Sequence, residues 1–419
     1  MKYLGLVLLV LLSACTGSQT DTITAVLAVA ANVSTATGSV GLIRFYDTSR
    51  LQPGSGASSS GCQKTSQQDS VCQLVWTWTL DQPIVALFYQ RSTQATQPDQ
   101  LWVLTPSQLR RYATTGFTTN PASAPPLPTN TVTTPDLNTD CNQGYLRQGS
   151  SKLLLVCPTT NPNQPLALPS AWIIDLNNPS LDPTANPALN LSSLSSVVAP
   201  LRLTLDNQDR LIYLGPQQIG IGQDLTDTTK FRSLVGLANR PTTTTEVPSD
   251  LAVVVDNKTN LATAYGLFAD PTSGDLATYL LTWDLSSTPT FIPAPTPDVS
   301  LSANFFAAGG LPLVVLGRPV CNPACSTTNG KALARFDGAF KLPPITVLDR
   351  SSQYSAAVLG LDQYLYAAQY IPGVGGSTLR VLDFFGPTES LTPIGLASLT
   401  LDPVANATTV ALAYVPVAQ

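Results

Sequence analysis

The stretch from Asp250 to Pro293, DLAVVVDNKTNLATAYGLFADPTSGDLATYLLTWDLSSTPTFIP, decides the fold. It divides into short runs rich in Val, Leu, Ala and aromatic residues, separated by Pro, Gly, Asn, Asp, Ser and Thr. Short runs bounded by turn residues are typical of β-strands. The stretch therefore predicts four strands joined by turns, at Asp250–Asp256, Leu261–Phe268, Leu276–Asp284 and Pro289–Pro293.

The third run ends in Trp283 followed by Asp284, and an apolar or aromatic residue followed by Asp recurs along the chain. The copies are Phe45-Tyr46-Asp47, Ile173-Ile174-Asp175, Thr282-Trp283-Asp284, Arg335-Phe336-Asp337 and Val381-Leu382-Asp383. Two degenerate copies lie at Leu109–Tyr112 and Gln218–Ile221. In each clear copy the Asp is suited to hold the following turn through its carboxylate. Seven third-strand candidates result, spaced by about 45 to 65 residues.

This organisation resembles that of β-propellers, in which four-stranded blades repeat around a ring. No window after the N-terminal segment shows a helical period. The resemblance implies an all-β fold: a single β-propeller of seven four-stranded blades. It names no family, since the signatures of WD repeats, sialidases and quinoprotein repeats are missing. A pair of two-sheet sandwiches and an eight-bladed ring are the alternatives.

The two ends of the folded region predict how the ring closes. The run Thr408–Val415 has no later partner, while Ile23–Ala31 and Gly41–Tyr46 begin a blade that lacks its innermost strand. Pairing of the N- and C-terminal strands completes that blade and removes two open edges. Two segments read as insertions, Gln52–Ser70 and the proline-rich Pro121–Pro135, which we expect to be extended and exposed.

Seven cysteines fit an oxidising compartment. Apart from Cys15 they form three close pairs in sequence, and short loops favour local bridges. These bridges would join Cys62 to Cys72, Cys141 to Cys157 and Cys321 to Cys325. Six cysteines allow about fifteen connectivities, so proximity leaves the pairing open. A redox or metal site at Cys321-Asn-Pro-Ala-Cys325 is less favoured than a staple, because three residues intervene and Pro323 suggests a turn.

The N-terminus carries a targeting signal. Met1-Lys2-Tyr3 precedes the apolar run Leu4–Leu12, and Leu12-Ser13-Ala14-Cys15 follows. Because a cysteine stands after small residues, the segment resembles a bacterial lipoprotein signal, or lipobox. The resemblance implies cleavage before Cys15 and acylation there with diacylglycerol and a palmitate-like chain. A transmembrane anchor is the alternative, but the run is shorter than the roughly twenty residues that a helix needs.

The lipobox also predicts organisation and place. We expect a signal peptide at 1–14, a lipidated cysteine with a short tether at 15–22 and the propeller at 23–419. The protein would be held on the periplasmic or extracellular side of a bacterial membrane. Thr16, which is not Asp, favours the outer membrane or cell surface within the lipoprotein pattern.

Composition excludes whole classes of chemistry. The chain has no histidine, and its only methionine is Met1, so His-dependent triads and His or Met metal ligands are absent. We expect no cofactor, although oxygen-ligated calcium is compatible with the residues present. The net charge is −5, or −6 once Lys2 is removed, and 11% of residues are charged without a basic run. Nucleic acid is therefore not an expected partner.

Two functions remain. The first is a non-enzymatic binding or scaffold module that presents its loops to an envelope protein or glycan; no catalytic residue is assigned. The alternative is a propeller-type hydrolase or lyase with carboxylates or calcium at the centre of the ring. Its candidates are the turn-like Asp206, Asp256, Asp362 and Asp402 and the only glutamates, Glu246 and Glu389.

Two tryptophans give a further hypothesis. Trp76 and Trp78 alternate in Val75-Trp76-Thr77-Trp78-Thr79, so they share one face of a predicted strand. An exposed pair of this kind stacks on sugars. Packing between blades is the alternative interpretation.

Overall fold

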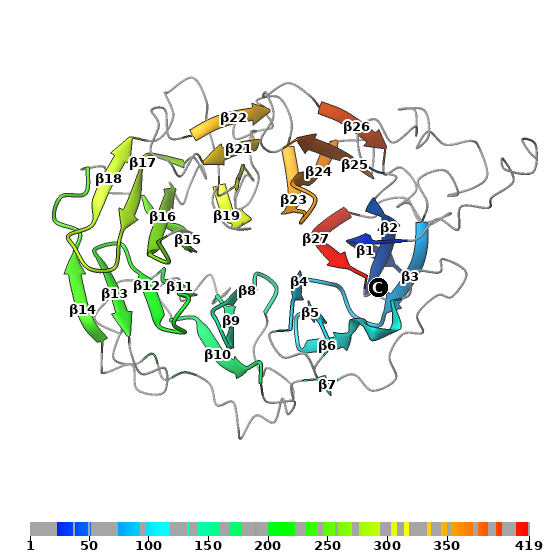
Figure 1. The fold of residues 1–419 in the computed structure, drawn as a ribbon, viewed down its shortest axis with the longest axis horizontal. Helices are drawn as coiled ribbons and strands as arrows, with labels where there is room; N and C mark the ends of the chain where they lie inside the picture. Colours follow the sequence, from blue (N-terminus) through cyan, green and yellow to red (C-terminus); the bar gives the residue numbers. More distant parts are fainter. Residues whose placement is uncertain are drawn as a thin grey trace, which may run out of the picture.

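The computed structural model shows an all-β protein whose sheets stand around a ring (Figure 1). It describes these residues: 23–36, 38–48, 51, 74–92, 98–117, 132–133, 141–158, 168–177, 189, 191, 200–222, 231–241, 246–255, 259–269, 276–293, 303–307, 314–317, 333–336, 345–349, 353–371, 376–383, 391–395 and 408–417. Within them lie seven antiparallel sheets. This arrangement is a β-propeller, and each sheet is one blade.

The strands of each blade follow one another from the centre of the ring outward. Blade 1 is β27 (Thr408–Pro416), β1 (Ala25–Thr35), β2 (Gly38–Asp47) and β3 (Leu74–Leu80). Blade 2 is β4 (Ala86–Gln90), β5 (Gln100–Leu104), β6 (Leu109–Ala113) and β7 (Val132–Thr133). Blade 3 is β8 (Tyr145–Gln148), β9 (Lys152–Cys157) and β10 (Ser170–Asp175). Blade 3 thus has three described strands where four were expected.

The other four blades each have four described strands. Blade 4 is β11 (Arg202–Leu205), β12 (Leu211–Leu214), β13 (Gln218–Gly222) and β14 (Phe231–Gly236). Blade 5 is β15 (Val247–Val255), β16 (Ala262–Ala269), β17 (Leu276–Trp283) and β18 (Thr290–Pro293). Blade 6 is β19 (Ala303–Ala307), β20 (Val314–Gly317), β21 (Leu333–Phe336) and β22 (Ile345–Asp349). Blade 7 is β23 (Gln353–Leu359), β24 (Tyr364–Ile371), β25 (Gly376–Asp383) and β26 (Leu391–Gly395).

The repeat predicted from the sequence is confirmed. All seven candidates lie on third strands: β2, β6, β10, β13, β17, β21 and β25. Within the proline-rich segment the structure describes Val132 and Thr133, which form the outer strand β7 and pair with Arg111 and Arg110. Gln52–Ser70 lies outside the described residues.

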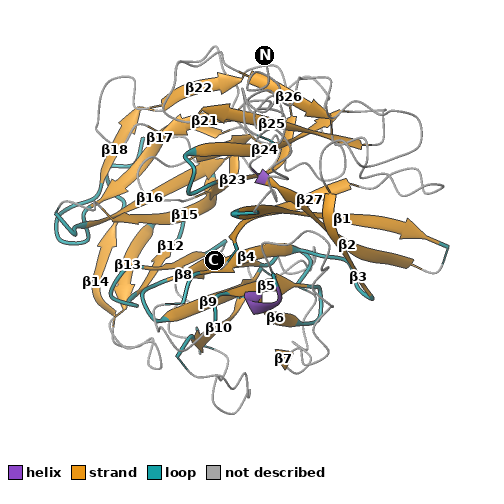
Figure 2. Ribbon diagram, turned by 45° about the vertical axis from the view of Figure 1, so that its right-hand side comes forward, coloured by secondary structure: helices purple, strands orange, loops and turns teal. Residues whose placement is uncertain are grey.

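The predicted closure is confirmed as well. β27 pairs antiparallel with β1, in a register that sets Ala413 opposite Ala28 and Val415 opposite Val26 (Figures 1 and 2). Since β27 is the innermost strand of blade 1 and β1 is the second, both ends of the folded region belong to one sheet. Main-chain hydrogen bonds therefore close the ring.

Blades 1 to 4 each pack on both neighbouring blades, one through each face, which explains their continuous apolar runs. Val26, Ala28 and Ala30 of β1 join a core with blade 2, whereas Leu27 and Val29 join a core with blade 7. Side chains of a strand alternate between faces, and here both faces are covered. Strands in this position lack the polar alternation of a half-exposed sheet.

Candidate functional site

Polar residues gather where the innermost strands of blades 3, 4 and 5 begin. β8 contributes Tyr145 and Arg147, β11 contributes Arg202, and β15 contributes Ser249 and Asp250. These strands face the centre of the ring (Figure 1). We call this set the inner polar cluster, and it is the candidate site.

An ion pair joins blade 3 to blade 5. Arg147 Nη2 lies 2.7 Å from Asp250 Oδ1, and the side chains are 18% and 3% exposed. Asp250 also accepts a hydrogen bond from the Leu251 backbone N–H at 2.7 Å. Arg147 donates further to the carbonyls of Leu146 and Leu251, at 3.2 and 3.5 Å. This carboxylate is thus neutralised and held, as a buried charge must be.

A second arginine lies beside this pair. Arg202 donates from Nε to the Ser249 carbonyl at 2.6 Å and from Nη1 to the Leu201 carbonyl at 3.4 Å. Ser249 stands at an irregularity of β15, where the pairing with β16 shifts between Pro248 and Asp250. An irregularity of this kind redirects backbone groups. Here the Ser249 carbonyl at the irregularity accepts the hydrogen bond that orients the Arg202 guanidinium.

Tyr145 packs against Arg147 and bonds to Leu203, the residue that follows Arg202. The Arg147 guanidinium lies 4.8 Å from the centre of the Tyr145 ring, within the range of a cation–π contact. The Tyr145 hydroxyl donates to the Leu203 carbonyl and accepts from the Leu203 N–H, at 3.3 and 3.0 Å. Burial raises the pKa of Tyr145 above its ordinary 10, against the opposing effect of Arg202 and Arg147. The phenol therefore stays protonated near neutral pH.

The inner polar cluster carries an excess of positive charge. The cluster contains two guanidinium groups and one carboxylate, whereas the whole chain has a net charge of −5. Tyr145, Arg147 and Arg202 are each partly exposed although they belong to innermost strands. Water therefore reaches a cationic position near the centre of the ring.

Sequence reasoning missed this cluster. It treated Asp250 only as a strand boundary and did not single out Tyr145, Arg147, Arg202 or Ser249. The available signal was a charged residue at the start of several inner strands in a chain with 11% charged residues. What the sequence does not give is the contact between Arg147 and Asp250, which lie 103 positions apart.

Two of the carboxylates considered for catalysis, Asp206 and Asp362, hold turns. Asp206 accepts from the N–H groups of Gln208 and Arg210 and from Arg210 Nε. Asp362 accepts from the Tyr364 N–H and the Tyr366 hydroxyl, at 3.2 and 2.6 Å. Both turns join the first and second strands of a blade.

Of the remaining candidates, the structure describes Glu246. Glu246 accepts a hydrogen bond from the Tyr279 hydroxyl at 2.6 Å and lies 3.7 Å from Arg240. Asp256, Asp402 and Glu389 fall outside the described residues. Across the part of the chain that the structure describes, no three His, Cys, Asp or Glu side chains group together as a set of metal ligands.

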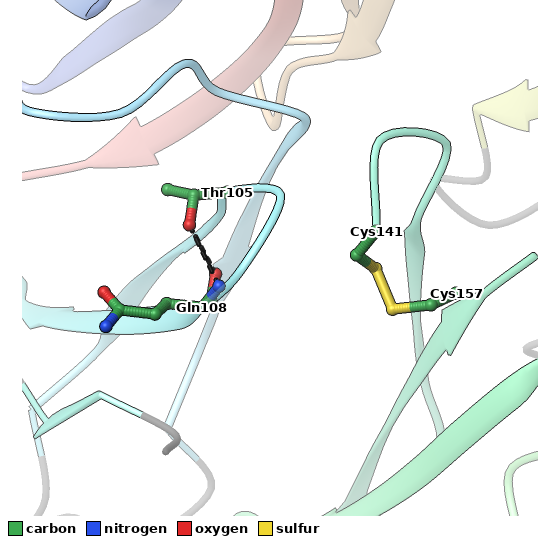
Figure 3. The surroundings of a disulfide bond; sticks show 4 residues. All are labelled: Thr105, Gln108, Cys141 and Cys157. Atoms are coloured by element: carbon green, nitrogen blue, oxygen red, sulfur yellow. Dashed lines mark hydrogen bonds between the residues drawn. A yellow bond between two sulfur atoms is a disulfide. The ribbon is translucent and has the colours of Figure 1, made fainter. Parts of the chain in front are cut away.

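Cys141 and Cys157 form a disulfide, the second of the three bridges suggested by spacing. It joins the turn before β8 to the end of β9, and it belongs to the core between blades 2 and 3. The Cys141 N–H donates to the Pro106 carbonyl, in the turn that Thr105 and Gln108 bracket (Figure 3). The bridge therefore fixes the entry to β8, the strand that carries Arg147.

Trp76 and Trp78 lie in the core between blades 1 and 2. They are 2% and 4% exposed and pack with Phe45 and Phe117 at ring-centroid distances of 4.8 to 6.1 Å. A sugar needs a free ring face, and these faces are covered by other aromatic rings. The positions fit the packing interpretation.

The other predicted sites lie outside the described residues. These are Cys15, the lipidation candidate, and the proposed pairs Cys62 with Cys72 and Cys321 with Cys325. Among described residues, no helix has the length and apolar character needed to cross a bilayer.

Comparisons with known proteins assign no family to this chain. No family model matches the chain, and no curated protein does. Among solved structures it is similar to a mutant of ACO from Synechocystis, at 9% identity and a TM-score of 0.43, covering 94% of this chain and 93% of that one. It is similar to the Dos1 propeller at 9% and 0.41, covering 80% and 72%.

A third similar structure is the β-propeller domain of the Trilobed protease from Pyrococcus furiosus, which has an open velcro topology. The identity is 10% and the TM-score is 0.34, with 71% of this chain and 81% of that chain covered. At identities of 9–10% these likenesses concern fold alone. They carry no argument about chemistry.

Proposed function

We propose that this protein is a lipid-anchored envelope protein that works as a non-enzymatic binding or scaffold module for a protein or glycan partner. The observation that carries the proposal is that three carboxylates in the described part of the chain are already occupied by hydrogen bonds within the protein. Asp206, Asp250 and Asp362 each accept hydrogen bonds from the backbone and from a second side chain.

Catalysis by carboxylates asks for something different. A general base needs a lone pair directed at the substrate, and a pair of acid and base needs two carboxyl groups facing one bond. Asp250 faces Arg147 and is 3% exposed, whereas Asp206 and Asp362 belong to turns of blades 4 and 7. Their geometry supports a rigid framework that presents loops and the inner polar cluster to a partner.

Crosslinking tests the binding function. Intact cells that express the chain with a C-terminal tag are treated with a cleavable crosslinker, and the captured proteins and glycans are identified by mass spectrometry. We expect one partner in stoichiometric yield. A tagged, secreted propeller of unrelated sequence, carrying the same lipobox, is the control for crowding at the membrane. Equal capture by that control, or no capture, contradicts the proposal.

The anchor is tested separately through Cys15. We expect wild-type protein to fractionate with membranes and to carry acyl mass on Cys15. Cys15→Ser should leave an uncleaved or released protein, whereas Thr16→Ser, one position along, should behave as wild type. A Cys15→Ser protein that matures and partitions normally overturns the lipoprotein part of the proposal and leaves the crosslinking result unaffected.

A further inference from the structure

Arg202 combines a fixed position with unused binding capacity. Its Nε and Nη1 atoms donate to the Ser249 and Leu201 carbonyls. Among the described residues no carboxylate lies within 4 Å of it, unlike Arg147, which pairs with Asp250. Main-chain carbonyls orient a guanidinium without cancelling its charge. Arg202 is thus a positioned cation with N–H donors left over.

We infer that Arg202 binds the carboxylate of a singly charged ligand such as a sugar acid. The inference rests on the proposed binding function and names the chemistry that the inner polar cluster recognises. A planar guanidinium matches a carboxylate and forms charge-assisted hydrogen bonds with it. The partial exposure of Arg202 leaves the group open to solvent.

The charge of the cluster selects a monoanion. Within the inner polar cluster, Arg147 and Arg202 supply two positive charges and Asp250 one negative charge, so these described residues carry one positive charge in excess. A carboxylate restores neutrality. A phosphate, with a charge near −2, would bring a second negative charge close to the buried Asp250 carboxylate.

Arg202 opens the innermost strand of blade 4, and the other members of the cluster belong to the innermost strands of blades 3 and 5. These three strands follow one another along the inner side of the ring (Figure 1). A ligand that reaches Arg202 therefore meets side chains from three blades.

Galacturonic acid and galactose are the probes, because they differ only at C6, which is a carboxylate in the first and a hydroxymethyl group in the second. Binding to the full-length protein is followed by ligand-observed NMR titration. We expect galacturonate to bind, galactose to bind at least about tenfold more weakly, and galacturonate affinity to fall with added salt. Inorganic phosphate is added as a competitor to test whether the site prefers a carboxylate to a phosphate.

Two variants locate the site. Arg202→Gln should weaken galacturonate binding at least about tenfold, since a charge-assisted contact is lost. Arg110→Gln removes the same charge from an arginine on β6 of blade 2, where it pairs with Asp81. This control variant should change the affinity for galacturonate by less than about twofold. Arg202→Lys, which keeps the charge without the planar group, should give an intermediate affinity.

Asp250→Asn tests whether the loss of galacturonate binding in Arg202→Gln comes from a folding defect. Removing this anion frees the charge of Arg147, so galacturonate should bind severalfold more tightly in a protein that is no more stable than wild type. Equal losses in Arg202→Gln and Arg110→Gln, equal binding of galactose, or absent binding of galacturonate each overturns the inference. None of these results affects partner capture by crosslinking, so the two proposals fail separately.

Discussion

Two regions of the ring are held together by different chemistry. At the closure, β27 and β1 join through a ladder of backbone hydrogen bonds, and no charged residue lies among the pairs that face one another in this register. Across blades 3 to 5, polar side chains reach from blade to blade. Arg147 meets Asp250, and Asp209 accepts hydrogen bonds from residues 150–152.

The two regions meet different structural requirements. The closure has to join strands from opposite ends of the folded chain, and apolar pairing without charge suits this, since a buried charge there has no partner. The polar side lies within continuous chain and can accommodate charge. We expect substitutions to be most damaging at the closure and binding to depend on the polar side.

The largest expected effect comes from a charge placed in the closure. Ala413 is 3% exposed and lies opposite Ala28, which is fully buried. Ala413→Asp should lower the free energy of unfolding by about 3–5 kcal/mol, the usual effect of an unpaired buried charge. Urea unfolding monitored by tryptophan fluorescence measures this.

The matched control introduces the same residue on the outer strand of the same blade. Thr77 of β3 is exposed, so Thr77→Asp should change the free energy of unfolding by less than about 0.5 kcal/mol. Similar effects of the two substitutions would show that β27 does not lie inside blade 1.

On the polar side, the largest effect should come from the disulfide. Cys141 and Cys157 are separated by 16 residues, and a loop of this size predicts a loss of about 3 kcal/mol when the bridge is removed. In the Cys141→Ala, Cys157→Ala double variant, amides 145–148 of β8 should also exchange hydrogen faster than those of β27. Equal exchange in both strands would contradict the inference that the disulfide fixes β8, the strand that carries Arg147.

Sequence reasoning recovered the third strands because their signal is local. Asp284 shows how: its carboxylate accepts from the N–H groups of Ser286 and Ser287, so an Asp after an aromatic residue marks the turn into the next strand. Asp175 accepts likewise from the Asn177 N–H. The closure was also predictable, since strands without partners at both ends need one another.

The inner polar cluster was not predictable for the opposite reason. Its contacts join Tyr145 to Leu203 and Arg147 to Asp250, across 58 and 103 positions. No local pattern encodes which strand starts meet around a ring. Asp206 and Asp362 drew attention as isolated carboxylates near strand ends, a position that a turn explains as well as a catalytic site does.

A smaller effect tests the link between blades 3 and 4. Asp209 accepts from the backbone N–H groups of Ser150, Ser151 and Lys152 and from the Ser151 hydroxyl, at 2.6 to 3.2 Å. Its φ of 58° lies in the left-handed region. Asp209→Ala should cost about 2 kcal/mol, because it leaves several donors unpaired and strains the backbone.

Glycine and asparagine variants divide that cost. Asp209→Gly removes the carboxylate but tolerates the positive φ, so the difference between Gly and Ala measures backbone strain. Asp209→Asn keeps one acceptor oxygen and should lose about 1 kcal/mol. Equal free energies of unfolding in wild type and Asp209→Gly would mean that the polar side needs no such link.

The smallest effect concerns a polar contact that stays within one blade. Hydrogen bonds from the Ser286 and Ser287 N–H groups and the Ser287 hydroxyl lower the pKa of the exposed Asp284 from 3.8 to about 2. A carboxyl whose pKa is lower in the folded than in the unfolded state adds stability above the unfolded value and loses it as the pH falls through the folded value. The contribution should therefore fade between about pH 4 and pH 2.

Carbon-detected NMR of the Asp284 carboxyl carbon measures this titration directly. Ser287→Ala removes the hydroxyl donor at 2.7 Å, so the midpoint should rise from about 2 toward 3.8 without reaching it, because both backbone donors remain. Ser286→Ala is the matched control, and it should move the midpoint less, since its side chain contributes least to the shift. Because Asp284 is exposed and its contacts do not cross between blades, neither variant should shift the urea midpoint at pH 7 measurably. A clear shift there would mean that turns within a blade stabilise the ring as the links between blades do, which would remove the distinction between the two kinds of polar contact.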